Sequence, residues 1–162
     1  MIERKYLAHY LDSSFGSGNA ATYVRIGKDL EEYSEELNPS VDITQNILGE
    51  TSVRNSGYQP QGSVDPYYTE YDDALSTKVL QIANTRATGD ATKTTMVDVL
   101  IRPGQTASAD PTVVWAYRED VYVVPDSVGG DTTGVQTPFT IYKAGNRVAG
   151  TFDLATKTFT PS

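Results

Sequence analysis

The part of the sequence that follows residue 89 consists mainly of short segments with the pattern of β-strands, and this restricts the fold more than any other feature. Val, Ile, Thr and Tyr are frequent in them, and such residues pack well on a pleated sheet. Turn-forming Gly, Pro and Asn separate most of them. The segments are 94–102, 112–117, 121–124, 137–143, 147–153 and 157–160. We therefore expect a mainly β fold.

Further strands are expected before residue 89. Segments 6–11 and 22–27 flank a stretch rich in Ser and Gly, which predicts an early hairpin. Segment 41–47 places its apolar residues on one side, an alternation typical of a half-buried strand. Near the C-terminus, the Ala-Gly-Asn sequence at 144–146 separates two strand segments and predicts a second hairpin.

One segment has the pattern of an α-helix. Asp65-Pro66 supplies a capping residue and then a proline, which is favoured at the first helical position. Gly89 offers a C-terminal stop. Between them, apolar side chains recur at helical spacing along one stripe, which consists of Tyr71, Leu75, Val79 and Ile82. The sequence therefore predicts one helix between Pro66 and Gly89.

The strand segments also indicate how the layers are arranged. Segments 96–101 and 113–115 are apolar on both faces, so both faces of the central sheet must be covered. The single helix can cover part of one face. This predicts a β-sandwich or small barrel with one flanking α-helix, whose free strand edges invite pairing with another subunit. A length of 162 residues fits one domain.

Within the stretch 51–89, the polar residues 54–62 before the helix are predicted to be a long loop. It contains Arg54-Asn55-Ser56-Gly57-Tyr58-Gln59-Pro60-Gln61-Gly62 and is too long for a simple turn. Loops of more than about 12 to 15 residues in compact domains are usually functional or disordered. The hypothesis for this stretch is that it contacts another subunit.

Composition excludes several classes of function. The chain has 21 acidic and 13 basic residues and a net charge of −8, which argues against general attraction to nucleic-acid phosphates or anionic lipid. It has no cysteine, so disulfides, thiolate zinc sites and thiol catalysis are excluded together.

Motifs for catalysis are lacking as well. His9 is the only histidine and is interpreted as a structural residue, partly buried or exposed, and no Gly-x-Ser-x-Gly motif occurs. The adjacent acids Glu31-Glu32, Asp72-Asp73 and Glu119-Asp120 are interpreted as surface charges rather than glycosidase pairs. The acidic loop 126–131 lacks EF-hand spacing. The sequence predicts no enzyme, no cofactor and no metal site.

The order of these elements resembles a known family. An N-terminal hairpin with Tyr23-Val24-Arg25-Ile26-Gly27-Lys28-Asp29-Leu30, the alternating strand at 41–47 and Gly57-Tyr58-Gln59-Pro60 precede the helix and a C-terminal meander. This looks like the major tail tube protein of long-tailed bacteriophages, especially the non-contractile siphophage or prophage type. The resemblance covers nearly the whole chain and lies in architecture more than in signature residues.

The resemblance implies a structural virion protein. Subunits of the family close into hexameric rings, and stacked rings form a β-lined channel through which the genome leaves the virion, with the helix outside. Partners implied are the protein itself and the tape measure, tail terminator and tail-tip proteins. DNA would pass without binding, and no membrane is involved. The implied location is the phage tail, with assembly in the bacterial cytoplasm.

The resemblance also suggests residues to examine. By position, residues 44–65 would reach a neighbouring subunit or the next ring, with Arg54, Tyr58 and Pro60 as candidate contacts. Asp42 and Asp98 lie within predicted strands and are candidates for acids that face the channel. An outward-facing acid, or one paired with a lysine, is the alternative for both.

Other expectations concern the extent of the chain and competing functions. Many family members carry an additional immunoglobulin-like domain, whereas residues 1–162 are expected to form a single tail-tube-like domain without it. One alternative function is the inner tube of a contractile tail or a related injection system. Another, from a different class, is a monomeric β-sandwich module that binds a ligand through exposed tyrosines.

Overall fold

The structure is a computed structural model and describes residues 1–16, 21–27, 30–102 and 112–162. Lys28 and Asp29, which belong to the segment quoted for the family resemblance, lie outside the described residues. In chain order the elements are the 3₁₀ helix η1 (Arg4–Tyr6), β1 (Leu7–Asp12), β2 (Tyr23–Ile26), β3 (Glu35–Glu36), β4 (Pro39–Gln45), β5 (Thr51–Tyr58), β6 (Gln61–Val64), α1 (Ala74–Thr85), η2 (Gly89–Thr92), β7 (Lys93–Leu100), β8 (Val113–Pro125), β9 (Gly129–Asp131), β10 (Gly134–Gln136), β11 (Phe139–Lys143), β12 (Val148–Asp153) and β13 (Thr158–Pro161).

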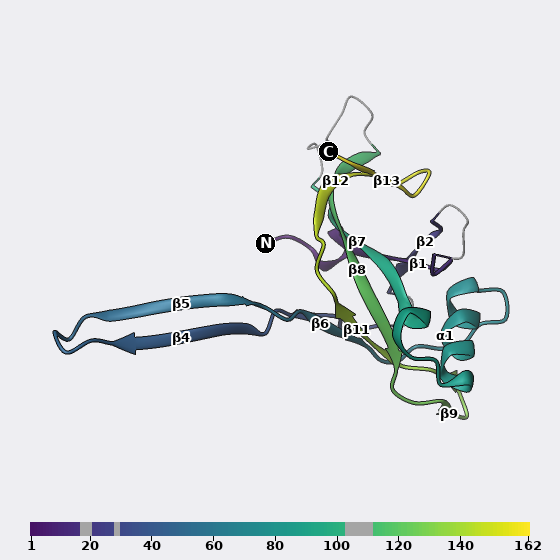
Figure 1. The fold of residues 1–162 in the computed structure, drawn as a ribbon. Helices are drawn as coiled ribbons and strands as arrows, with labels where there is room; N and C mark the ends of the chain where they lie inside the picture. The colour runs from purple at the N-terminus through teal and green to yellow at the C-terminus, as the bar shows by residue number, and fades with distance from the viewer. Residues whose placement is uncertain (17–20, 28–29, 103–111) are drawn as a thin grey trace.

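The main sheet is antiparallel and curls into a half-barrel, with α1 against one flank (Figure 1). Its strand order is β2-β1-β7-β8-β11-β6-β3, and β12 pairs with both β8 and β13. The early hairpin is confirmed, because β1 pairs with β2 from His9 opposite Ile26 to Asp12 opposite Tyr23. The prediction of a mainly β fold with one flanking helix is also confirmed within the described residues.

The longest strand, β8, differs from the prediction. Segments 112–117 and 121–124 were expected to be separate strands, but residues 118–120 continue the strand because they pair with β7. The predicted hairpin around residues 144–146 is also wrong. β11 and β12 do not pair with each other, since both pair in succession with one edge of β8. The polar residues 118–120 have the sequence pattern of a turn, although they lie inside a long paired strand.

The helix α1 begins later than predicted. Residues Tyr67 to Thr69 form backbone hydrogen bonds with Val135 and Thr137, which hold this segment extended. The side chain of Asp73 then accepts a hydrogen bond from the backbone nitrogen of Leu75 and acts as the N-cap. Asp65-Pro66 is therefore not the helix start, and Tyr71 is fully exposed outside the helix.

The C-terminal end of α1 and its length also follow from the structure. The helix ends at Thr85, with Arg86 in the left-handed conformation as the C-cap, so Gly89 is not the residue that stops it. At 12 residues α1 is the longest helix among the described residues, and none of the described helices is long and apolar enough to cross a membrane.

Replacing Asp73 with alanine is expected to lower the free energy of unfolding by about 1 kcal/mol, the usual cost of losing an N-cap. The Asp73 carboxylate also accepts a hydrogen bond of 3.2 Å from the Ser76 hydroxyl, so the loss affects two groups in the first turn. Urea denaturation followed by circular dichroism measures the change in the free energy of unfolding. The neighbouring exposed Asp72→Ala is the control, and equal effects of both substitutions would contradict the capping role.

Two hydrophobic clusters occupy opposite faces of the sheet, which explains segments that are apolar on both sides. Side chains along β8 alternate between faces, so Val121 and Val123 enter the cluster under α1 and Val114 and Ala116 enter the other. The cluster under α1 comprises Leu11, Tyr33, Val64, Leu75, Val79, Met96, Val121, Val123, Phe139 and Ile141. The opposite cluster comprises Ala8, Tyr10, Tyr23, Val97, Val99, Val114, Ala116, Phe152 and Phe159. Both faces of the sheet therefore carry a buried cluster.

Candidate assembly surface

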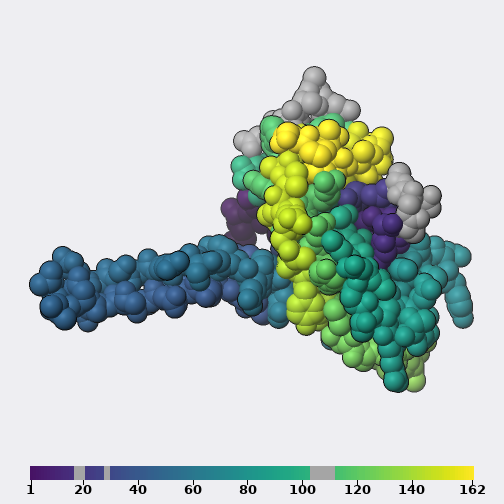
Figure 2. Space-filling model, viewed as in Figure 1, coloured from purple at the N-terminus to yellow at the C-terminus, as the bar shows by residue number. Residues whose placement is uncertain are grey.

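The most prominent feature of the molecule is a long β-hairpin that projects from the sheet, called here the arm (Pro39–Tyr58). It consists of β4 and β5, which form a separate two-stranded sheet (Figures 1 and 2). The loop predicted at 54–62 is therefore wrong, since residues 51–58 form β5 and residues 61–64 form β6 in the main sheet. The strand predicted at 41–47 exists as β4, but it is exposed along its whole length instead of half-buried.

The arm has one apolar face and one polar face. Opposite residues of an antiparallel pair point to the same side, and Ile43 lies opposite Val53 while Asp42 lies opposite Arg54. Ile43 is 70% exposed and Val53 is 65% exposed. A β-bulge at Ser40/Val41 gives the arm its irregular base.

The tip of the arm, residues 46–50, is a turn held by side-chain hydrogen bonds, and it presents apolar side chains to solvent. The side-chain oxygen of Asn46 accepts hydrogen bonds from the backbone nitrogens of Leu48 and Glu50 at 2.9 and 3.0 Å. Ile47 and Leu48 are 102% and 77% exposed. A two-stranded hairpin alone is marginally stable in water, so exposed apolar surface on this arm indicates a partner that covers it.

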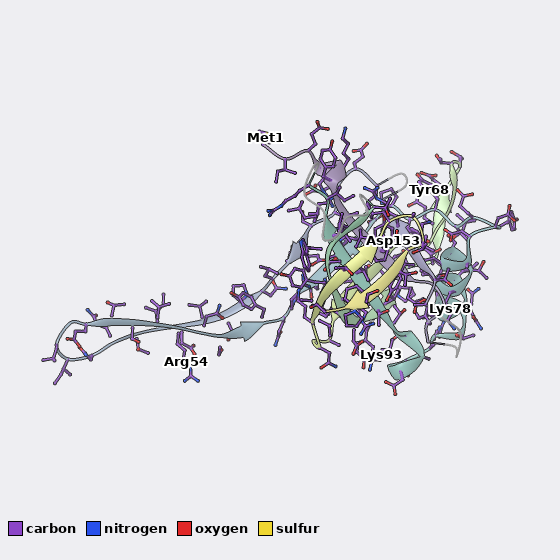
Figure 3. All side chains as sticks on the ribbon, turned by 90° about the horizontal axis from the view of Figure 1, so that it is seen from above. Met1, Arg54, Tyr68, Lys78, Lys93 and Asp153 are labelled. Carbon is purple, nitrogen blue, oxygen red and sulfur yellow. The ribbon has the colours of Figure 1, made fainter. Side chains whose placement is uncertain are left out.

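Most of the residues singled out from the sequence lie on the arm or at its base. Arg54 lies opposite Asp42 on the polar side of the arm (Figure 3). Tyr58 ends β5 and is 58% exposed, and Pro60 follows in the link to β6. Asp98 is separate from them, because it lies on β7 and is only 9% exposed.

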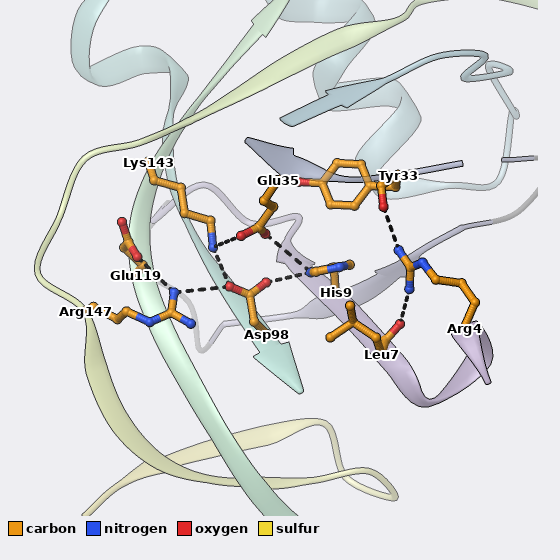
Figure 4. Close-up of polar contacts among 9 residues, drawn as sticks. All are labelled: Arg4, Leu7, His9, Tyr33, Glu35, Asp98, Glu119, Lys143 and Arg147. Carbon is orange, nitrogen blue, oxygen red and sulfur yellow. Dashed lines mark hydrogen bonds and ion pairs between the residues drawn. The ribbon is translucent and has the colours of Figure 1, made fainter. Parts of the chain in front are cut away.

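Asp98 belongs to a cluster of charged side chains next to the base of the arm (Figure 4). His9 Nδ1 lies 2.6 Å from Asp98 Oδ1, and Lys143 forms an ion pair with the other oxygen, Oδ2. Lys143 Nζ also lies 3.1 Å from Glu35 Oε2. Four strands supply these groups, β1, β7, β11 and β3, so the cluster ties the two-residue strand that leads into the arm to the main sheet.

Arg147 extends the cluster toward solvent. Its Nη1 donates to Asp98 Oδ2 at 3.3 Å and to Glu119 Oε1 at 3.0 Å. Glu119 is 5% exposed, so its interpretation as a surface charge is wrong. It is buried because it lies inside β8, where this strand pairs with β7. His9, at 6% exposed, is a buried structural residue, more buried than expected.

The two central carboxyl groups differ in acidity. Burial alone would raise the pKa of Asp98, but its hydrogen bond with His9 and the charge of Lys143 outweigh burial and hold that pKa well below its usual range. Burial, and then the negative charge of Asp98, raise the pKa of Glu35 above its usual value. Asp98 is therefore the more acidic of the two carboxyl groups, and Glu35 is the one that is more readily protonated.

The cluster also resembles a metal-ligand set, because ligand atoms of His9, Glu35 and Asp98 lie within 4.8 Å of one another. The ammonium group of Lys143 already pairs with both carboxylates. A protein cation thus supplies the positive charge that a metal would bring, and the arrangement acts as a buried ion-pair network.

Tyr33 completes the attachment of the arm. Its ring packs edge-on against His9 with centroids 4.8 Å apart, and its backbone oxygen accepts a hydrogen bond from Arg4. The hydroxyl end of the ring lies against Gly62, where a Cβ atom would stand 2.5 Å from the Tyr33 hydroxyl oxygen. Glycine at this position lets the segment before β3 pack closely on β6.

Comparison with known proteins gives a structural match only. No protein-family model matches the sequence, and no curated protein matches it. The structure is similar to the sheath/tube terminator of PVC, an extracellular contractile injection system, in its extended state. The TM-score is 0.50 at 10% sequence identity, over 92% of this chain and 96% of that one. The two chains share a fold, the curled antiparallel sheet with one helix that is typical of tail tube and terminator proteins.

Proposed function

We propose that this protein is a structural subunit of a phage tail tube, whose copies close into hexameric rings and stack into a channel for genome delivery. The observation that carries the proposal is the arm, a hairpin with an uncovered apolar face that projects from a sheet of the tail tube and terminator type. Such an arm has surface to bury only in an assembly.

The sheet itself offers further means of self-association. β2 and β3 are the two ends of the strand order, so each has one edge without a partner among the described strands. Free edges pair readily with strands of another chain. Edge pairing within a ring and arm contacts between subunits would together produce a closed, stacked assembly, in which Arg54, Tyr58 and Pro60 are proposed contacts at the arm and its base.

The charge of the chain suits a channel that DNA must leave. A hexamer would carry six times the subunit charge of −8, and acidic side chains repel phosphate within a Debye length of about 8 Å. Asp42, exposed on the arm, is the candidate for a channel-facing acid, whereas Asp98 is paired with Lys143. The proposed partners are further copies and the tape measure, terminator and tail-tip proteins, and the proposed location is the virion.

A second candidate function is a terminator ring that closes the end of a tube. The fold match favours it, because the matched chain is itself a sheath/tube terminator. The inner tube of a contractile tail is the corresponding variant of the first candidate. These functions differ in one physical property: a tube subunit polymerises indefinitely, and a terminator stops at one ring.

Negative-stain electron microscopy and sedimentation velocity of the concentrated protein test the proposal. A tube subunit is expected to give hollow tubes of varied length, and a terminator is expected to give single rings of one size. A protein that stays monomeric over a wide range of concentration and salt, and also in the presence of its tail-tip proteins, would refute both and favour a monomeric binding module.

A further inference from the structure

The sheet face that packs against α1 is covered by the helix at one end of β8 and exposed to solvent at the other end. On β8, Trp115 and Tyr117 point to the same face as Val121 and Val123, because side chains alternate along the strand. The latter two pack under α1, whereas Trp115 and Tyr117 are 61% and 48% exposed. Leu7, which is 37% exposed, lines a surface hollow together with Trp115 and Tyr117. We call Leu7, Trp115 and Tyr117 the aromatic ledge.

The rim of the aromatic ledge is positively charged. Arg102 and Arg147 line the same hollow as Trp115 and Tyr117. The Arg147 guanidinium stacks over the Tyr117 ring at 4.6 Å from its centroid, and 44% of its side chain is exposed. Arg102 is exposed as well. The carboxylates that pair with Arg147, Asp98 and Glu119, are buried, so the exposed charge among the residues that line the hollow is cationic.

The arm tip has the complementary properties. Ile47 and Leu48 present apolar side chains, and Glu50 beside them supplies an exposed negative charge. In Figures 1 and 3 the arm points away from the body in two perpendicular views, so its tip cannot reach the ledge of the same chain. A tip that fits this ledge must therefore come from another copy.

We propose that the aromatic ledge receives the arm tip of a second copy of this chain, with Ile47 and Leu48 covering Trp115 and Tyr117 and Glu50 paired with Arg102. The inference rests on the proposed function and names the surface that the arm contacts. The contact joins two different surfaces, so it is heterologous and repeats from copy to copy into a ring or a stack. It buries two apolar patches that the monomer leaves in water.

Charge reversal tests the pairing. Glu50→Arg places a cation against Arg102 and is expected to raise the concentration needed for assembly by about tenfold, a change that like charges can cause. Arg102→Glu is expected to do the same, and the double variant is expected to recover assembly. Lys93→Glu, an exposed reversal at the other end of β7, is the control and should leave assembly unchanged. Failure of the double variant to recover would count against the contact.

Cross-linking tests the contact independently of charge. The chain has no cysteine, so single-cysteine proteins report one position each. A mixture of Leu48→Cys and Tyr117→Cys proteins treated with a short bismaleimide is expected to give a heterodimer. In the control, Tyr142→Cys replaces Tyr117→Cys, because Tyr142 is 42% exposed on the opposite face of the sheet, and little product is expected.

The two failures can be told apart. If the wild-type protein forms rings or tubes but the Leu48 and Tyr117 variants give no more product than the control, the ledge is not the receiving surface and the proposed function stands. If no assembly forms, the same cross-link at high concentration still decides the contact: product above the control supports it, and its absence overturns it.

Discussion

Asp98→Ala is expected to lower the free energy of unfolding by about 3 to 5 kcal/mol, the range found when one partner of a buried ion pair is removed. The Lys143 side chain is 1% exposed and, among the described residues, would keep only Glu35 as its ion-pair partner. His9 would lose its hydrogen bond of 2.6 Å as well. Urea denaturation followed by far-ultraviolet circular dichroism gives the measurement.

The control for this substitution is Asp126→Ala. Asp126 is exposed and accepts one hydrogen bond, from the Thr140 hydroxyl, at the end of the same sheet. Its loss is expected to change stability by less than about 0.5 kcal/mol. A comparable effect of both substitutions would mean that the buried network contributes no more than an exposed polar contact.

The pH dependence of stability provides a second reading of the same site. The pKa of Asp98 is lower in the folded protein, so its stabilising contribution is fully present above the pKa of the unfolded chain, about 3.9, and is lost as the pH falls below that value. The stability difference between wild type and Asp98→Asn should therefore be largest near neutral pH and shrink below about pH 4. A difference that stays constant down to the acid limit would contradict the assignment.

Glu35 is expected to act in the opposite direction. Its pKa is raised in the folded protein, so the stability linked to its protonation is present at low pH and is lost as the pH rises through that raised value. Glu35 thus offsets part of the acid sensitivity that Asp98 causes. The two carboxyl groups pair with the same lysine and still have opposite effects on the pH profile.

Sequence patterns located β1 and β12, which bury a face, and β4, which does not, but they missed β5 and β6. Segments 6–11 and 147–153 agree with β1 and β12 to within one residue at each end. β5 was taken for a loop because Val53 is its single aliphatic residue, and one apolar residue creates no alternating pattern. The turn at residues 46–50 was the available signal for the arm, since Asn and Gly there favour a tight reversal.

The charge cluster could not be predicted from the sequence because its members are distant in the chain. His9 and Asp98 are 89 positions apart and become opposite neighbours only when β1 pairs with β7. Each appeared alone as a polar residue in an apolar strand. Two such residues in strands that are expected to be central are a sign of mutual pairing, because an unpaired buried charge is costly.

Replacing residues 41–56 with Asn-Gly is expected to abolish assembly and leave a folded monomer. Ser40 and Gly57 are opposite each other, so a two-residue turn can close the hairpin at that pair. Among the strands that the structure describes, β4 and β5 pair only with each other, and the main sheet and both hydrophobic clusters include no residue from 41–56. Circular dichroism should show a cooperative unfolding transition close to that of the wild type, while sedimentation and electron microscopy should show no rings or tubes.

A pair of matched substitutions distinguishes the apolar face of the arm from its mere presence. Ile43→Thr with Val53→Thr keeps a cross-strand pair and removes apolar surface, whereas Thr44→Ala with Ser52→Ala alters the next pair on the polar face. Only the first variant is expected to impair assembly, because burial of apolar area drives association at about 25 cal/mol per Å². Normal assembly of the first variant would show that the arm acts through its backbone and polar side. Impairment of both to the same degree would instead indicate that the folding of the arm itself, which either change disturbs, is what limits assembly.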